Sequence, residues 1–431
     1  MVGLKELTHE LNHENAPERL RALSAIKRFV DRGLINTPER LGYTNNHVHT
    51  QYSFSPYSPT KAVWTGYQSG LSTIGIMDHD TLRGAEEFIK AGEIMHMPTT
   101  IGFEIRTDWS DTKLKGKRIN NPDQKTVAYI AAHGIPHSQI HRVDQFLAPV
   151  RKARNQRNRK MVDRINAIMV PHGLSIDFDR DVYPLSKAHD GGAITERHLL
   201  FALTNKILAK YTGGEDLLTF LTESLGINIG DKQKAYLTDT DNSMIAYDLL
   251  NVLKSNFVKA IYLDAAPPET PPIAEMVSFI KSIGAISSYC YLGDVGQSPT
   301  GDKKAQTFED SYLIDVLDTC QALGFNAIAY MPSRNTREQL QRIIGLCNDY
   351  GFMQISGEDI NQPRQSFLCE ALLQPEYQHL GDTTWALVGH ELAASRSMAD
   401  TMFKEDEKAG DHPIADRIKH YRNIAINHYN L

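Results

Sequence analysis

The chain has 431 residues, of which 41% are hydrophobic and 23% are charged, ordinary values for a soluble globular protein. This length allows two or three domain-sized units, or one barrel with a large insertion. The net charge of −6 gives no case for binding nucleic acid or an anionic membrane. The first residues lack the apolar region of a signal peptide, and no apolar run approaches the ~20 residues needed to span a bilayer. Because the four cysteines form no Cys-x-x-Cys pair, we expect a cytoplasmic protein with reduced thiols.

The predicted secondary structure divides the chain into five segments. They are a helical N-terminal extension (1–43), the first part of an α/β unit (44–142), a helical insertion (143–257), the second part of the α/β unit (258–370) and a helical tail (371–431). In the α/β parts, short apolar strands alternate with amphipathic helices, which is typical of a parallel architecture. After a first strand near Asn45, we expect strands at residues 71–77, 98–105, 126–132, 284–288, 325–330 and 352–356. The polar segment 113–125 predicts a loop or hairpin.

Two histidines stand at the end of the first predicted strand. His47 and His49 flank a single valine, so the alternation of an extended segment puts both imidazoles on one face. Two neighbouring imidazoles chelate a divalent metal through neutral nitrogens. Further acids and histidines follow later strands, in the stretches Asp78-His79-Asp80, Gly102-Phe103-Glu104 and Gly357-Glu358-Asp359. This repetition at strand ends predicts a metal site at one rim of a barrel.

In this order, the four stretches resemble the motifs of the PHP (polymerase and histidinol phosphatase) superfamily of metal-dependent phosphoesterases. The resemblance covers about residues 44–365, with the helical insertion where some members of the family carry one. It implies a distorted (β/α)7 TIM-like barrel with an inserted helical subdomain and helical extensions at both ends. The site is then expected at the rim formed by the carboxyl ends of the strands.

The resemblance also implies roles for single residues. The ligands of the first metal site in the family match His47, His49, Glu104 and Asp359, and a histidine of the third site matches His79. This mixed set of imidazoles and carboxylates suits one to three divalent ions of manganese, zinc or iron. His79 or Asp80 is the candidate that protonates the leaving group or orients the attacking water.

At other positions the chain departs from the family pattern. Residues of a different kind stand where further ligands are expected, at Phe54, Tyr291 and Asn361. Candidate substitute ligands follow later strands, at His133, His137 and Asp294. The alternative is a surface-loop role for the two histidines and turn chemistry for the aspartate. The residues therefore describe a divergent branch with a changed ligand set.

The insertion begins with a strongly basic stretch at residues 151–160. Family members that carry the insertion use arginines there to hold a substrate phosphate, and a guanidinium suits a bidentate phosphate contact. On this basis the candidate substrate-binding residues are Arg157, Arg197, His198 and Asn361, with Lys303, Lys304 and Arg334 as further rim charges. The alternative interpretation is a solvated helix face.

The function predicted from these residues is metal-dependent hydrolysis of a small phosphorylated substrate, either a phosphomonoester or a small nucleotide or sugar phosphate. Metal ions would polarise the phosphoryl oxygens and activate water. Two alternatives stay open: a metalloenzyme of another kind, such as a sugar isomerase or a different hydrolase, and a non-catalytic metal-binding protein.

Overall fold

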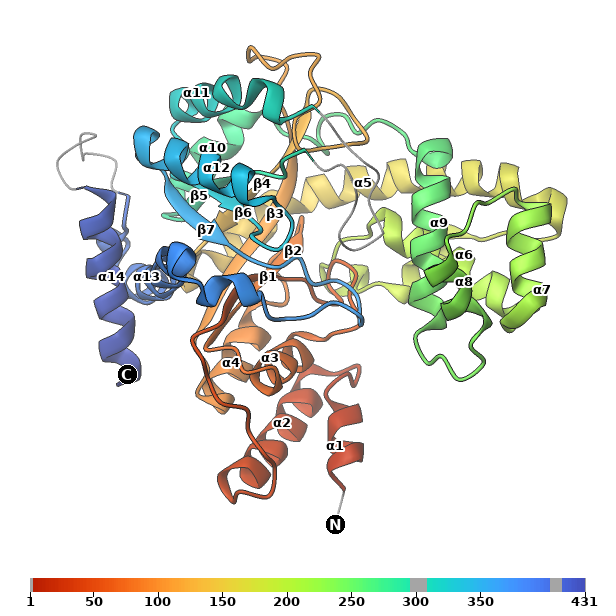
Figure 1. Cartoon of the computed structure of the whole chain (residues 1–431), viewed down its shortest axis with the longest axis horizontal. Helices are drawn as coiled ribbons and strands as arrows, with labels where there is room; N and C mark the ends of the chain where they lie inside the picture. Colours follow the sequence, from red (N-terminus) through yellow and green to blue (C-terminus); the bar gives the residue numbers. More distant parts are fainter. Residues whose placement is uncertain (1–2, 295–307, 404–412, 431) are drawn as a thin grey trace.

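The computed structural model describes residues 3–294, 308–403 and 413–430. Its centre is one seven-stranded sheet in which the strands follow one another in chain order (Figure 1). The strands are β1 (Thr44–Val48), β2 (Thr73–His79), β3 (Thr99–Asp108), β4 (Val127–His133), β5 (Ile286–Cys290), β6 (Ala327–Tyr330) and β7 (Met353–Ser356). Each expected strand is therefore present, with bounds that shift by a few residues.

The sheet curls until its two edges nearly meet. Val48 at the end of β1 forms a parallel bridge with Ile360, which follows β7. The backbone of Ile360 accepts a hydrogen bond from His49 and donates one to the carbonyl of His47. A nearly closed barrel results, which confirms the expected α/β TIM-like architecture with helical extensions.

Strand β4 runs in the opposite direction to its neighbours. It pairs antiparallel with both β3 and β5, whereas the other neighbouring strands pair in parallel. The reason is the connection at residues 109–126, which contains no helix and so returns as a hairpin rather than as a crossover. The expectation of a purely parallel sheet is wrong at this strand, and the loop or hairpin expected at 113–125 causes it.

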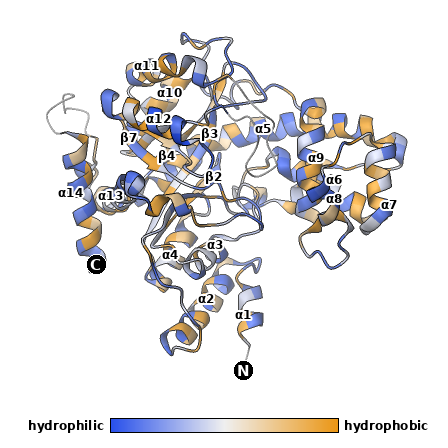
Figure 2. Ribbon diagram, viewed as in Figure 1, coloured by the Kyte–Doolittle hydropathy of each residue, from blue (hydrophilic) through white to orange (hydrophobic). Residues whose placement is uncertain are grey.

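Helices cover the outside of the barrel, and Figure 2 shows that they carry separate hydrophilic and hydrophobic sides. The helices between and after the strands are α3 (Pro59–Gln68), α4 (Ala85–Met95), α10 (Ile273–Ser282), α11 (Leu313–Leu323), α12 (Arg337–Tyr350), α13 (Gln378–Arg396) and α14 (Ile414–Tyr429). Of the N-terminal pair, α2 (Ala16–Asp31) packs on α3 and α4, and α1 (Leu4–Glu10) packs on α2. Leu387 of α13 packs with Ile286 and Met353 from the strands, so this helix closes the end of the barrel at which most strands begin.

Between β4 and β5 the chain forms a group of helices beside the barrel (Figure 1). They are α5 (Ile140–Met169), α6 (Glu196–Lys210), α7 (Gly214–Thr219), α8 (Asp231–Thr238) and α9 (Ile245–Ile261), here called the inserted helices. They enclose a second apolar core with members such as Leu203 and Leu249. Phe54, from the loop after β1, belongs to this core and adopts a positive φ of 100°. In the described ranges, no helix combines the length and the apolarity that crossing a membrane requires.

Candidate metal centre

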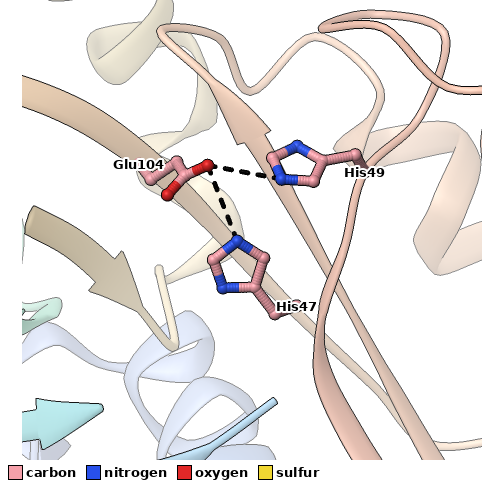
Figure 3. A group of neighbouring side chains, drawn as sticks. All are labelled: His47, His49 and Glu104. Atoms are coloured by element: carbon pink, nitrogen blue, oxygen red, sulfur yellow. Dashed lines mark ion pairs between the residues drawn. The ribbon is translucent and has the colours of Figure 1, made fainter. Parts of the chain in front are cut away.

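A group of imidazoles surrounds one carboxylate at the rim of the barrel. Oε1 of Glu104 on β3 lies 3.6 Å from Nε2 of His47 and 3.3 Å from Nε2 of His49 (Figure 3). Nδ1 of His79, at the end of β2, lies 3.0 Å from the same oxygen. Parallel pairing of β1, β2 and β3 brings these strand ends together, since His79 is in register with Glu104. The predicted convergence at one rim is thus what the backbone pairing produces.

Asp359, in the loop after β7, completes this group. Its Oδ1 lies 3.2 Å from Nε2 of His49. The same oxygen accepts a hydrogen bond of 2.6 Å from the amide of Asn361. The candidate substrate-binding residue Asn361 therefore lies at the centre, where its amide orients a predicted ligand.

Ser53 and Asp78 determine which nitrogen of His49 faces the carboxylates. The hydroxyl of Ser53 donates to Asp78 at 2.6 Å and lies 3.1 Å from Nδ1 of His49. Because the serine hydroxyl donates its proton to the hydrogen bond with Asp78, the serine oxygen accepts a hydrogen bond from the N–H at Nδ1 of His49. In a neutral His49 the lone pair is then on Nε2, which points at Glu104 and Asp359. Such outer contacts hold a metal-binding imidazole in the ligating tautomer.

The charges of the group fit a bound cation. Burial disfavours the charged form of Glu104, yet the neighbouring imidazoles of His79 and His47 hold its pKa well below the usual range. Burial likewise lowers the pKa of His49, but Asp359 and Glu104 outweigh it and raise that pKa to about 10. The space between His49 and the two carboxylates therefore demands a positive charge, supplied either by a proton or by a metal ion.

The spacing favours a metal over a proton. Ligand atoms 2.0–2.1 Å from a tetrahedral zinc ion lie roughly 3.3 Å apart. The three distances from His47 and His49 to the carboxylates range from 3.2 to 3.6 Å, longer than a charge-assisted hydrogen bond. His47, His49 and Glu104 also offer three ligand atoms that all lie within 4.8 Å of one another. The donor set of His47, His49 and Glu104 therefore fits one divalent ion, and Asp359, 3.2 Å from His49, stays the predicted fourth ligand.

His79 and Asp80 differ in their surroundings. The side chain of His79 is 23% exposed, against 17% for His47 and 2% for His49, so His79 is the imidazole most open to a ligand at the rim. Asp80 has a positive φ of 54° and directs its carboxylate to Arg154 on α5, 2.5 Å away. Asp80 thus joins the barrel to the inserted helices and does not face the metal ligands.

The three proposed substitute ligands lie in three different places. His133 is buried, two residues along β4 from Ala131, which pairs with Glu104, so its side chain lies on the same face of the strand as that of Ala131. Burial lowers the pKa of His133 to about 3, so its imidazole is neutral, and no group hydrogen-bonds to its buried Nε2. His133 thus points into the barrel beneath the centre, because β4 runs opposite to its neighbours.

His137 and Asp294 do not join the group. Nε2 of His137 lies 2.9 Å from Glu391 of α13, at the end of the barrel away from the centre. Oδ1 of Asp294 accepts hydrogen bonds from the backbone of Phe308, Glu309 and Asp310, and so caps the start of the helix that follows. The placement of these two residues therefore does not support the prediction that they ligate a metal, and Asp294 bonds to the backbone 14–16 residues along the chain instead of forming a local turn.

The basic stretch forms an internal ion network instead of an open phosphate site. Arg157 lies 2.6 Å from Glu196 and 2.7 Å from Glu269. Arg154 bridges Glu196 and Asp80, and Arg106 of β3 bridges Glu196 and Glu269. Glu196 and Glu269 thus engage the guanidinium of Arg157, which we expected to bind substrate phosphate. Arg157 was predicted to bind a substrate phosphate, but in the structure it joins the inserted helices to the barrel.

The other candidates from the insertion lie in the first turn of α6. His198 is buried, and its Nδ1 accepts a hydrogen bond from the backbone of Thr195 at 3.0 Å. Burial lowers the pKa of His198 to about 3, so its neutral ring carries the proton on Nε2. Arg197 precedes it in the same turn. Arg334 donates to the carbonyl of Leu292, and Lys303 and Lys304 lie outside the described residues.

Sequence reasoning missed several residues of this region. Ser53 stands four residues after His49, but its hydrogen bond forms through a loop that has no sequence signature. Arg154 precedes Arg157 by one helical turn, and this spacing of i, i+3 was the available signal that both face one partner. Glu269 lies far along the chain from both, and no local pattern predicts its contacts.

No protein-family model matches the chain. A 5'-3' exoribonuclease from Haemophilus influenzae is 33% identical to it over 63 residues, which are 15% of this chain and 23% of that protein. The match therefore spans less than a quarter of the relative, and the activity of the relative is not carried over by it.

Two solved structures resemble the whole architecture. A proposed metal-dependent phosphoesterase from Bifidobacterium adolescentis matches with a TM-score of 0.51 and 19% identity, over 80% of this chain and 96% of the other. The chain shares its fold. An amidohydrolase from Chromobacterium violaceum, solved with bound sulfate and no metal, matches with a TM-score of 0.51 and 15% identity, over 76% of this chain and 90% of the other. The expected resemblance to metal-dependent phosphoesterases is confirmed at the level of the fold.

Proposed function

We propose that the protein hydrolyses a phosphoester of a small substrate at a divalent metal centre built from His47, His49, Glu104 and Asp359. The observation that carries the proposal is the convergence of two imidazole nitrogens and two carboxylate oxygens at 3.2–3.6 Å. The fold shared with a proposed metal-dependent phosphoesterase supports the reaction class. A divalent ion held there would supply positive charge to the phosphoryl oxygens and acidify an attacking water.

The residues of the chain would divide the remaining work. His79, the most exposed imidazole of the group, would contact the substrate and pass a proton to the leaving oxygen. Ser53 and Asp78 would hold His49 in the ligating orientation. Arg154 and Arg157 would keep the inserted helices in place above this chemistry.

The test uses the purified protein with added manganese or zinc. Its substrates are a small aryl phosphate, a nucleoside monophosphate and a 5'-phosphorylated oligoribonucleotide, the last prompted by the exoribonuclease match. We expect His49→Ala to lose both metal and hydrolysis. We expect His79→Ala to keep its metal and lose about 100-fold in turnover, a typical contribution of proton transfer. The exposed residue His141 provides the control, His141→Ala. Full metal loading without hydrolysis of any phosphoester would refute the proposal.

Amide hydrolysis is a second candidate, because the amidohydrolase matches the fold equally well by TM-score. A metal centre with an adjacent exposed histidine suits either reaction, since both need an activated water and a protonated leaving group. Assaying an N-acyl amino acid beside the phosphoesters separates the two. Turnover of the amide alone, lost in His49→Ala, would favour this candidate.

A further inference from the structure

The loop that carries Asp359 is a compact turn held together by a single glutamine. Nε2 of Gln365 donates to the backbone carbonyl of Asp359 at 2.8 Å. Its Oε1 accepts from the backbone of Asn361 at 2.7 Å and of Gln362 at 2.9 Å. Residues 359–365 therefore move as one unit, and any displacement of this loop displaces the carboxylate of Asp359.

One side of this loop is attached to the barrel. The backbone of Ile360 exchanges hydrogen bonds with His47 and His49, at 3.1 and 2.9 Å. These bonds place Asp359 opposite His49. The backbone N–H of Glu358 also donates to the side chain of Asn45 at 3.0 Å. These contacts hold only the first residues of the loop, so residues 362–365 need a second attachment.

The other side of the loop is attached to the inserted helices. Arg364 makes a bidentate ion pair with Asp248 of α9, at 2.8 and 2.9 Å, and its guanidinium lies 3.9 Å from the ring centroid of Tyr236. Three residues farther along α9, Asn251 donates to Gln362 at 2.5 Å. Because Asp248 and Asn251 are separated by i, i+3, both lie on one face of α9. That helix face therefore holds the loop at two points.

We propose that Arg364 is a positioning residue of the metal centre, which through its pair with Asp248 makes the placement of Asp359 depend on the placement of the inserted helices. This inference rests on the proposed metal centre, but not on the reaction. Among the connections between the inserted helices and the barrel, two involve ion pairs of arginine and differ in their burial. The network of Arg154, Arg157 and Glu269 is buried, with exposed fractions of 2%, 8% and 3% for the side chains.

The connection through Arg364 is different in kind. The side chain of Arg364 is 36% exposed, while its partner Asp248 is 5% exposed. An exposed arginine exchanges its contacts with water more easily than a buried one, so this connection opens before the buried network does. When it opens, α9 holds the 359–365 loop only through the hydrogen bond between Asn251 and Gln362, so Asp359 is held less firmly opposite His49. Arg364 thus couples the inserted helices to metal affinity.

The test compares zinc affinity between variants, measured by competition with a chromophoric chelator. Arg159 provides a matched control: it also pairs bidentately with an aspartate, Asp179, and also lies over an aromatic ring, that of Phe178, but contacts no part of the ligand loop. We expect Arg364→Ala and Asp248→Asn each to weaken zinc binding roughly 10-fold, the lower end of the range for outer contacts of metal ligands. We expect Arg159→Ala to bind zinc as tightly as the wild type.

The double variant Arg364→Ala/Asp248→Asn should weaken zinc binding no more than either single change, because both break the same pair. Zinc affinity in Arg364→Ala equal to that in Arg159→Ala would overturn the inference, as would additive effects in the double variant. Asp248→Asn decides the matter if Arg364→Ala does not fold. A wild type that binds zinc but hydrolyses nothing refutes the proposed function alone, whereas a wild type that binds no zinc refutes both.

Discussion

Arg157 on α5 and Glu196 at the start of α6 lie 2.6 Å apart, so the arginine best placed by sequence to hold a phosphate already holds a carboxylate. Glu196 also receives Arg154 at 2.7 Å and Arg106 at 3.1 Å. The three guanidinium groups lower the pKa of Glu196 well below its usual range, against the effect of burial. The carboxylate of Glu196 is therefore at the centre of the ion network that connects the inserted helices to the barrel.

Removing the charge of Glu196 should destabilise the protein. We expect Glu196→Gln to lower the free energy of unfolding by about 3 kcal/mol, since breaking a buried ion pair leaves uncompensated charge behind. Urea denaturation measures the change. Glu215→Gln, at an exposed position of α7, should change stability by less than about 0.5 kcal/mol. Equal stability of the two variants would show that the network contributes no net stabilisation.

Ser53 provides a test of how His49 is oriented. Ser53→Ala removes the oxygen that accepts from Nδ1 of His49, while every ligand atom stays in place. We expect metal affinity to fall by about 10- to 100-fold, the usual cost of losing an outer contact. Ser69→Ala, which deletes a hydroxyl bonded within α3, is the control. Unchanged metal affinity in Ser53→Ala, measured by chelator competition, would contradict the tautomer assignment.

The buried carboxyl group of Glu309 should make the stability of the protein depend on pH, independently of any metal. Burial raises the pKa of Glu309 to about 7, although Tyr289, Gly293 and Leu292 donate hydrogen bonds to it. The folded protein therefore holds a proton between pH 4.5 and 7 that the unfolded chain has released. Since the folded state then binds more protons, this group makes stability fall as the pH rises through that window, by up to about 3 kcal/mol.

Glu309→Gln should remove this contribution. Relative to the wild type, we expect the variant to be more stable at pH 8 than at pH 5, as measured from urea midpoints at the two values. Glu370→Gln, at an exposed position, should show no such change. A difference between wild type and Glu309→Gln that is constant with pH would mean that Glu309 is ionised throughout.

Gly389 is where α13 and α14 approach each other most closely. A methyl group there would collide with the backbone carbonyl of Tyr421, whereas a methyl group at Gly345 of α12 would meet nothing within 4 Å. We expect Gly389→Ala to destabilise the protein by about 1–3 kcal/mol through overpacking. We expect Gly345→Ala to stabilise it by about 0.5–1 kcal/mol, because alanine loses less conformational freedom in a helix. A lower midpoint of thermal unfolding for Gly389→Ala and a higher one for Gly345→Ala, each relative to the wild type, would confirm this contact.

The ligand-bearing strand ends could be predicted because each one depends on local pattern. An apolar strand ends at His79, another runs through Glu104, and the His-x-His spacing marks His47 and His49, so that side-chain alternation places these residues on the inner face. Asp359 followed from the same reasoning and lies where expected beside His49. The substitute ligands failed at His137 and Asp294, because a residue after a strand has no fixed direction once the chain enters a turn.

The sequence by itself determined the order of strands and helices, the two histidines that flank Val48 and the acids that face them, because short-range periodicity encodes each of these. Only the tertiary structure decided that β4 runs backwards, that Arg157 pairs with Glu196, and that Arg364 connects the Asp359 loop to α9. The last two contacts join residues that are 39 and 116 positions apart in the chain. Long-range pairing depends on how the whole chain packs, and no local pattern of residues carries that information.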